Sequence, residues 1–244
     1  MFGYLTLELR RSLRDRRFLL LVIGWPVGAY LLFSSVFGNE PGSQGLTANT
    51  EMMVAMAAFG AFGAVLTATG PRLANERQSG WLRQLRLTPL GAGRVLAARV
   101  LAALALTFPA ICLTFATAAA VRGVRLEVWQ WPALALLLCA GCIPFAAIGM
   151  VIGQVGDGDS AQGLTMVVYL AMSALGGVWM PVTILPSALQ TVAHALPSNR
   201  MAELGWQVAG GHAPTLTAVA VLGAWLVGAA LVARLLSRRI AARG

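Results

Sequence analysis

Uncharged, largely apolar stretches of about twenty residues recur six times along the chain. None of them contains Asp, Glu, Arg or His, and each is long enough to cross the hydrocarbon layer of a bilayer as a helix. A helix is the expected form because a backbone in lipid must satisfy its own hydrogen bonds. The stretches are residues 18–37, 52–71, 100–121, 133–153, 161–180 and 214–233. The pattern predicts an all-α, polytopic membrane protein in which residues 1–244 form a single transmembrane domain with six transmembrane helices.

The segment before the first stretch is amphipathic at helical spacing. Its apolar side chains lie three or four residues apart, at Phe2, Leu5, Leu9 and Leu13. This pattern predicts an N-terminal interfacial helix whose apolar face lies in lipid. Its arginines would face lipid headgroups or a cytosolic partner; the helix could equally serve only as a topology anchor. The arginines in question are Arg10, Arg11 and Arg14.

Composition and charge agree with this picture and set an orientation. Apolar residues make up 58% of the chain and charged residues 11%, which excludes an ordinary soluble domain. All eighteen basic residues are arginines, and fifteen of them lie in the N-terminal segment, in residues 72–99 and in the C-terminal tail. By the positive-inside rule these segments, and therefore both termini, are cytoplasmic. The net charge of +9 is thus a topology signal rather than a nucleic-acid-binding surface.

The longest cytoplasmic connection, residues 72–99, contains a short predicted helix at residues 76–87. Trp81, Leu82 and Leu85 share one face of this helix, and Pro89 ends it. An exposed apolar face on a cytosolic helix is typical of a contact with a partner protein. The same periodicity also fits a helix that lies on the membrane surface, so both interpretations stay open.

The longest external segment, residues 181–213, is still largely apolar. Pro181, Pro186 and Pro197 divide it into two predicted helices, residues 187–196 and 199–209, each too short to cross a bilayer. We expect these short external helices to be re-entrant, so that they enter the outer leaflet or cover the outer end of a pathway.

The sequence contains no recognisable catalytic constellation. It has no lysine, and the phosphate-binding loop of many ATPases needs one to reach the β- and γ-phosphates. Serine-hydrolase, zinc-protease and dinucleotide-binding motifs are missing, and no ionisable carboxylate or base lies inside a predicted span to couple an ion gradient. We therefore predict no catalytic residue, no metal site and no cofactor bound by this chain. Any transport would take its energy from another subunit.

One motif resembles a known family of membrane proteins. Residues 75–90 read NERQSGWLRQLRLTPL and are similar to the signature of type-two ABC exporter permeases, in which Glu-Arg is followed by a glycine, an aromatic residue, leucines and Thr-Pro. The motif follows the second predicted span, as it does in that family. The prolines between Met180 and Pro197, the six spans and the leading interfacial helix also resemble the family, so the resemblance covers the whole chain.

The resemblance implies a permease in a bacterial inner membrane, surrounded by lipids and paired with a second permease copy, identical or related. It also implies docking on separate ABC ATPase subunits, which bind ATP and Mg²⁺. The family assigns coupling to the ATPase to the segment after the second span, which here contains Glu76, Arg77, Gly80, Trp81, Leu82 and Leu85. Glu76 would lie at the membrane boundary, within reach of the arginines of the interfacial helix.

The family's substrate route lies between the second and fifth spans of the two protomers. By position this points to Phe59, Phe62, Met166, Tyr169 and Met172. Aromatic and methionine side chains suit an adaptable apolar site, although the same residues are common in ordinary packing.

The function predicted from the sequence is ATP-driven export of a hydrophobic or amphipathic molecule, of the drug, antibiotic or lipid type, out of the cytoplasm. The alternatives are a non-transporting membrane scaffold or sensor subunit, and a membrane enzyme with an unrecognised site. Recovery of an ATPase subunit with the purified chain would separate these classes.

Overall fold

The computed structural model describes residues 24–38, 42, 45–80, 92–179, 182 and 185–241, with only the backbone for residues 92–99, 240 and 241. These residues form helices joined by short connections, and no β-strand element occurs among them. The predicted all-α class is therefore confirmed for the described part of the chain. The helices are α3 (Trp25–Phe37), α4 (Ala48–Gln78), α6 (Ala92–Arg122), α7 (Gln130–Gly141), α8 (Ile143–Val155), α9 (Gly158–Leu175), α10 (Ser187–Ala195), α11 (Pro197–Ala209) and α12 (Leu216–Ala241).

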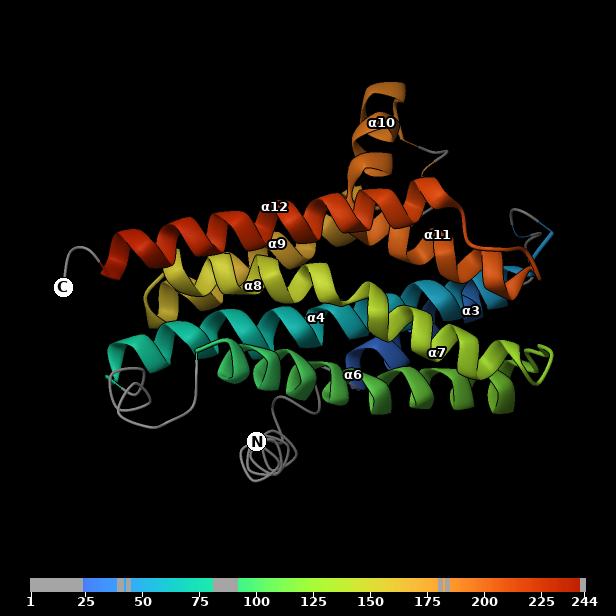
Figure 1. Ribbon diagram of the computed structural model, residues 1–244. Helices are drawn as coiled ribbons and strands as arrows, with labels where there is room; N and C mark the ends of the chain where they lie inside the picture. Colours follow the sequence, from blue (N-terminus) through green and yellow to red (C-terminus); the bar gives the residue numbers. More distant parts are fainter. Residues whose placement is uncertain are drawn as a thin grey trace.

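Helix α4 is the centre of the bundle (Figure 1). It begins at Thr47, whose side-chain oxygen accepts a hydrogen bond from the backbone N–H of Thr50 at 3.3 Å, an N-cap contact. Helices α3, α6, α8, α9 and α11 all pack against α4. Every residue from Met53 to Leu66 is consequently buried within one copy of the chain.

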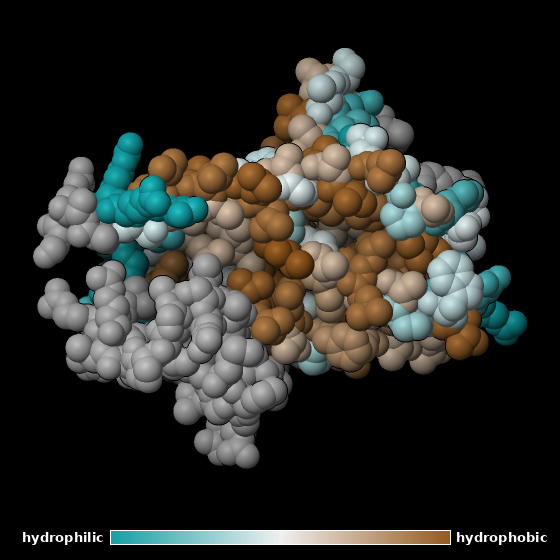
Figure 2. Space-filling model, in the orientation of Figure 1, coloured by the Kyte–Doolittle hydropathy of each residue, from teal (hydrophilic) through white to brown (hydrophobic). Residues whose placement is uncertain are grey.

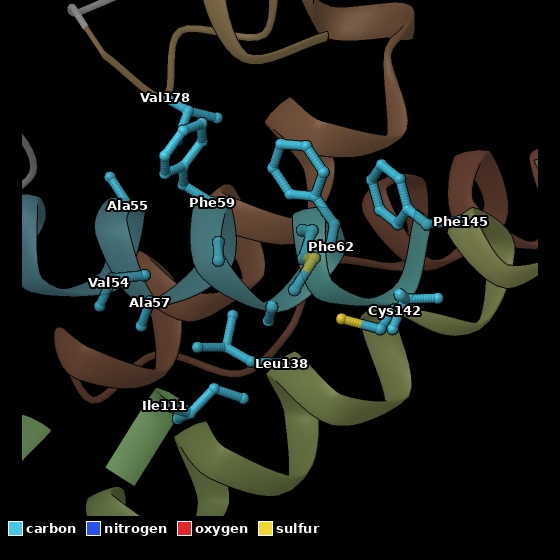
Figure 3. Packing of buried hydrophobic residues seen from close by; sticks show 14 of the residues in the cluster. Val54, Ala55, Ala57, Phe59, Phe62, Ile111, Leu138, Cys142, Phe145 and Val178 are labelled. Carbon is cyan, nitrogen blue, oxygen red and sulfur yellow. The ribbon is translucent and has the colours of Figure 1, made fainter. Parts of the chain in front are cut away.

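The core lies on both sides of α4. Figure 3 shows the ring of Phe59 directed toward Val178 and the ring of Phe62 close to that of Phe145. Ile111 of α6 and Leu138 of α7 lie on the opposite side of the same helix.

Four helices of the described chain are long and apolar enough to cross a membrane. They are Ala48–Gln78, Val100–Arg122, Gln130–Val155 and Leu216–Arg239, which correspond to the second, third, fourth and sixth predicted spans. Helix α3 covers only part of the first predicted span because residues 18–23 lie outside the described residues. Helix α9 covers residues 161–175 of the fifth predicted span, but it is not among these four helices, and Asp159 and Gln162 lie near its start. The count of six spans therefore stays a prediction.

The fourth span is interrupted near its middle. Helix α7 ends at Gly141, Cys142 forms a turn, and α8 starts at once with Pro144 in its first turn. Proline lacks the N–H that would continue the hydrogen-bond ladder, so a break is expected at this position.

Helices α4 and α8 approach each other closely because glycines lie at their crossing. A Cβ atom added to Gly153 would be 2.5 Å from the carbonyl oxygen of Gly70, and one added to Gly149 would be 1.9 Å from Thr69 Oγ1. Four-residue glycine spacing favours packing within a chain and dimerisation equally. The structure resolves this ambiguity, because both glycines pack against α4 of the same copy.

Both short external helices predicted from the prolines are present, as α10 and α11. Helix α11 is mostly buried and packs against α4, α7 and α12, whereas α10 stands away from the bundle (Figure 1). Two side-chain contacts join α11 to the end of α9: Ser198 Oγ donates to the carbonyl oxygen of Met172 at 2.7 Å, and Asn199 Nδ2 donates to that of Gly176 at 3.0 Å. The external position of these helices and their entry into the membrane stay predictions.

The ends of the bundle agree with the sorting of arginines. The last turns of α4, α8 and α12 lie at one end of the molecule, and the connection between α6 and α7 lies at the other (Figure 1). The start of residues 72–99 and the C-terminal tail are therefore on the same side, as the sequence predicts. The assignment of that side to the cytoplasm stays a prediction.

Thiol labelling of intact cells tests this orientation. In a variant without the three native cysteines, we expect His212→Cys to react with a membrane-impermeant maleimide, because residue 212 is exposed at the predicted external end. Ser79→Cys and Ser237→Cys are also at exposed positions and should react only after the membrane is permeabilised. Reaction of Ser79→Cys in intact cells would reverse the orientation. Ser198 is unsuitable as a probe position because its side chain is buried.

Candidate functional site

The end of α4 that leads into residues 72–99 is joined to α8 by Arg77. Its Nη1 donates hydrogen bonds to the carbonyl oxygens of Gly153 at 2.9 Å and Gln154 at 2.6 Å. Both carbonyls lie in the last turn of α8, where no further turn of helix supplies N–H donors. The positive guanidinium also stabilises the negative end of the α8 dipole. We call this contact of Arg77 with Gly153 and Gln154 the Arg77 junction.

The start of α9 lies against the same end of α4. A Cβ atom added to Gly158 would be 2.9 Å from Gln78 Oε1 and 3.0 Å from Asn75 Oδ1. The turn between α8 and α9 is closed locally, because the backbone N–H of Asp157 donates to Ser160 Oγ at 2.7 Å. The ends of α4, α8 and α9 therefore meet in one compact group.

Glu76 lies one turn after Arg72 on α4, with 4.0 Å between its Oε1 and Arg72 Nε. Its side chain is only 14% exposed, so a charged partner interacts with it more strongly than it would in open water. Gly80 follows the end of α4 with a φ of +70°, a left-handed conformation that glycine adopts without strain. Helix α4 thus ends at Gln78, directly after the Glu-Arg pair.

The other residues assigned to coupling lie outside the described residues. They are Trp81, Leu82 and Leu85 of the connection and Arg10, Arg11 and Arg14 of the interfacial helix. Their roles stay predictions.

Three of the five residues predicted for the substrate path belong to one aromatic cluster. The rings of Phe59 and Tyr169 stack with centroids 4.6 Å apart, and Phe62 meets Tyr169 edge-on at 5.3 Å. The hydroxyl of Tyr169 donates to the carbonyl oxygen of Phe59 at 3.3 Å. Phe145 and Trp179 complete the cluster by stacking on Phe62 and meeting Phe59 edge-on, respectively. Phe59 and Phe62 are thus core residues of the single copy rather than residues that line an open space.

The two methionines predicted for the path occupy different environments on α9. Met172 is buried, whereas Met166 is 48% exposed. Met166 shares the exposed side of α9 with Leu164, Val167 and Leu170. The structure therefore brings Tyr169 together with Phe59 and Phe62, and places Met166 on an outer surface.

Sequence reasoning missed Phe145 and Trp179 in the aromatic cluster and the acceptors of Arg77. The two aromatic residues lie in segments assigned to the fourth and fifth spans, where nothing in the sequence distinguishes a residue that faces another helix from one that faces lipid. The acceptors are backbone carbonyls, which every residue has, so no side-chain pattern marks them.

The chain belongs to the ABC-2 type transporter family, whose membrane-domain profile matches residues 4–205. It is therefore a membrane permease subunit of an ABC transporter. A protein of Bacillus subtilis (strain 168) named "Putative transport permease YvfS" is 28% identical over 233 residues, which cover 95% of this chain and 94% of that protein. The resemblance seen in the motif at residues 75–90 is thereby confirmed.

Proposed function

We propose that the chain exports a hydrophobic or amphipathic molecule, of the drug, antibiotic or lipid type, from the cytoplasm of a bacterium across its inner membrane. A separate ATPase subunit binds ATP and Mg²⁺ and supplies the energy, and a second permease copy completes the pathway. The observation that carries this proposal is the Arg77 junction, which connects the segment predicted to dock on the ATPase with helices inside the membrane.

The packing around α4 supports a mechanical route for the energy. In this proposal, movement of residues 72–99 displaces the end of α4. The Arg77 junction then transmits the displacement to α8 and to the turn before α9. Glycines bring the backbones of α4 and α8 into direct contact over the last turns, so these helices move together rather than slide independently.

The surface of α9 supports a pathway that needs two copies. Since α4 is enclosed within one copy, it offers little surface to a partner, whereas α9 exposes Met166 and Val167. We infer that a second copy covers this side of α9 and that the substrate passes beside it. Tyr169 and Met172, on the same helix, would then respond to the movement of α9 from within the core.

Reconstitution into liposomes tests the proposal. The purified chain alone should show only background ATP hydrolysis, and hydrolysis and movement of a fluorescent lipophilic dye should both appear when the cognate ATPase is added. Robust hydrolysis by the chain alone would refute the proposal that a separate subunit hydrolyses the ATP. Hydrolysis by the complex without movement of dyes or fluorescent short-chain lipids would favour the scaffold or sensor alternative.

Two variants separate docking from coupling in the same assay. We expect Trp81→Ala to weaken docking of the ATPase by about 2 kcal/mol or more, as truncation of an interface tryptophan does. Glu76→Ala should leave docking intact but lower dye movement per ATP hydrolysed, because in this proposal the carboxylate pairs with the arginines of the predicted N-terminal interfacial helix. Trp129→Ala is the matched control, since Trp129 is exposed at the opposite end of the bundle. Normal docking of Trp81→Ala would favour the alternative in which the segment that follows α4 lies on the membrane surface.

A further inference from the structure

An apolar groove runs between α8 and α12 on the outer surface of the bundle. Its volume is about 480 Å³. Ile148 and Val151 of α8 line one wall, and the other consists of α12 residues Ala224, Trp225, Gly228, Ala229 and Val232. No polar side chain apart from the Trp225 indole lines the groove. Figure 2 shows that the side of α12 in view is largely hydrophobic.

Gly228 leaves open space in the groove. A Cβ atom added to Gly228 would meet no atom within 4 Å, so the packing of α12 on its neighbours does not require a glycine at this position. Gly149 and Gly153, by contrast, are required by the contact with α4. Gly228 therefore leaves a space that a hydrocarbon chain can occupy without any rearrangement of the protein.

Trp225 forms the end of the groove that is farther from the C-terminus. Its indole N–H donates to the carbonyl oxygen of Ala195 at 2.7 Å, which attaches the ring to the end of α10. The groove therefore leads away from Trp225 toward Val232 and the C-terminal turns of α12.

Arg239 lies beyond the end of the groove that is nearer to the C-terminus. Arg239 follows Val232 by seven residues, which is about two turns and roughly 10 Å along the same face of the helix. Arg234 is exposed too, but it lies two residues from Val232 and so about 200° around the helix, on the other side. Figure 2 shows hydrophilic side chains at this end of α12, next to the hydrophobic face.

We propose that the groove binds an acyl chain of an anionic phospholipid and that Arg239 holds its phosphate. The order of groups fits such a lipid: hydrocarbon contacts from Trp225 to Val232, then a cation where the helix leaves the apolar layer. The alternative occupant is a second copy of the chain, which small residues such as Ala224 and Gly228 also permit. We favour the lipid because the arginine is in line with the groove and a like-charged second copy would not pair with it. This inference does not depend on the proposed transport activity.

Photocrosslinking tests the site. The purified chain in detergent is mixed with phosphatidylglycerol that carries a diazirine in its acyl chain, irradiated, and mapped by peptide mass spectrometry. We expect adducts at Val151, Trp225 and Val232 and few at Val227, which is 58% exposed but lies outside the groove. Gly228→Leu should reduce groove adducts to background. Gly223→Leu is the matched control, because Gly223 also has open space around it but is not in the groove.

The headgroup is tested separately. Arg239→Gln should lower labelling by phosphatidylglycerol about fivefold, from the loss of roughly 1 kcal/mol of attraction, and leave labelling by phosphatidylcholine unchanged. Arg234→Gln should change neither. Equal labelling of Val227 and the groove in the unmodified chain would overturn the proposal, as would full labelling of a Gly228→Leu variant. Dissociation of a dimer on Gly228→Leu, measured by light scattering, would assign the groove to a second copy instead.

Discussion

Replacement of Arg77 by glutamine should uncouple ATP hydrolysis from transport while leaving the ATPase docked. The substitution removes a charged donor from the carbonyls of Gly153 and Gln154, which then lose both hydrogen bonds and the favourable charge at the end of α8. Hydrogen bonds to charged groups contribute roughly 1.5–3 kcal/mol, so the junction should open in a large fraction of molecules under load. We expect co-purification and hydrolysis close to normal, with dye movement per ATP reduced about tenfold or more.

Arg234→Gln is the control for this result. Arg234 is an exposed arginine near the same end of the bundle, and no side-chain contact of its guanidinium is found among the described residues. Its loss removes the same charge without opening a junction. Arg77→Lys adds a second comparison, because a lysine keeps the charge but lacks the forked geometry of the guanidinium. Normal coupling in Arg77→Gln would show that force reaches the membrane by another route.

Gly153→Ala should destabilise the folded chain strongly. The added methyl group would lie 2.5 Å from the carbonyl oxygen of Gly70 and 2.7 Å from Leu73 Cβ, and neither atom can move away without a shift of the α4 backbone. Overpacking of this kind costs about 1–3 kcal/mol or more. We expect the midpoint of thermal unfolding in detergent, followed by fluorescence-detected size exclusion, to fall by roughly 5–10 °C.

The same substitution at Gly163 should have the opposite sign. Gly163 lies inside α9, and a Cβ atom there would meet nothing within 4 Å. Alanine is favoured over glycine in a helix by about 0.8–1 kcal/mol, so Gly163→Ala should be neutral or slightly stabilising. Equal melting of the two variants would mean that α4 and α8 are not in contact at Gly153, and the Arg77 junction would lose its structural basis.

The candidate site could be read from the sequence only in part. The Glu-Arg-x-x-Gly motif and its position after the second span identified the segment that leaves α4, because the order of residue types along one segment is local information. The acceptors of Arg77 lie 76 and 77 residues away and are backbone atoms. Only the folded arrangement of α4 and α8 brings them within reach.

The aromatic cluster could also be predicted only in part from the sequence. Phe59 and Phe62 are three residues apart, so the helical period already places them near one face of the second span. Whether that face meets a substrate, lipid or another helix is decided by Phe145, Tyr169 and Trp179, which come from other segments. The stacked cluster inside one copy was therefore outside the reach of sequence reasoning.

By itself the sequence determined that the chain is helical and membrane-embedded, which segments are apolar enough to span, and that the start of residues 72–99 lies on the same side as the end of α12. These properties follow from the free energy of single segments in lipid and water, so they need no tertiary information. The tertiary structure alone decided which spans are central. Within their most apolar stretches, 83% of α4 but only 17% of α12 is buried, although both read as ordinary spans. Lipid chains are as apolar as a protein core, so in a membrane hydrophobicity does not mark the buried face, and packing alone selects it.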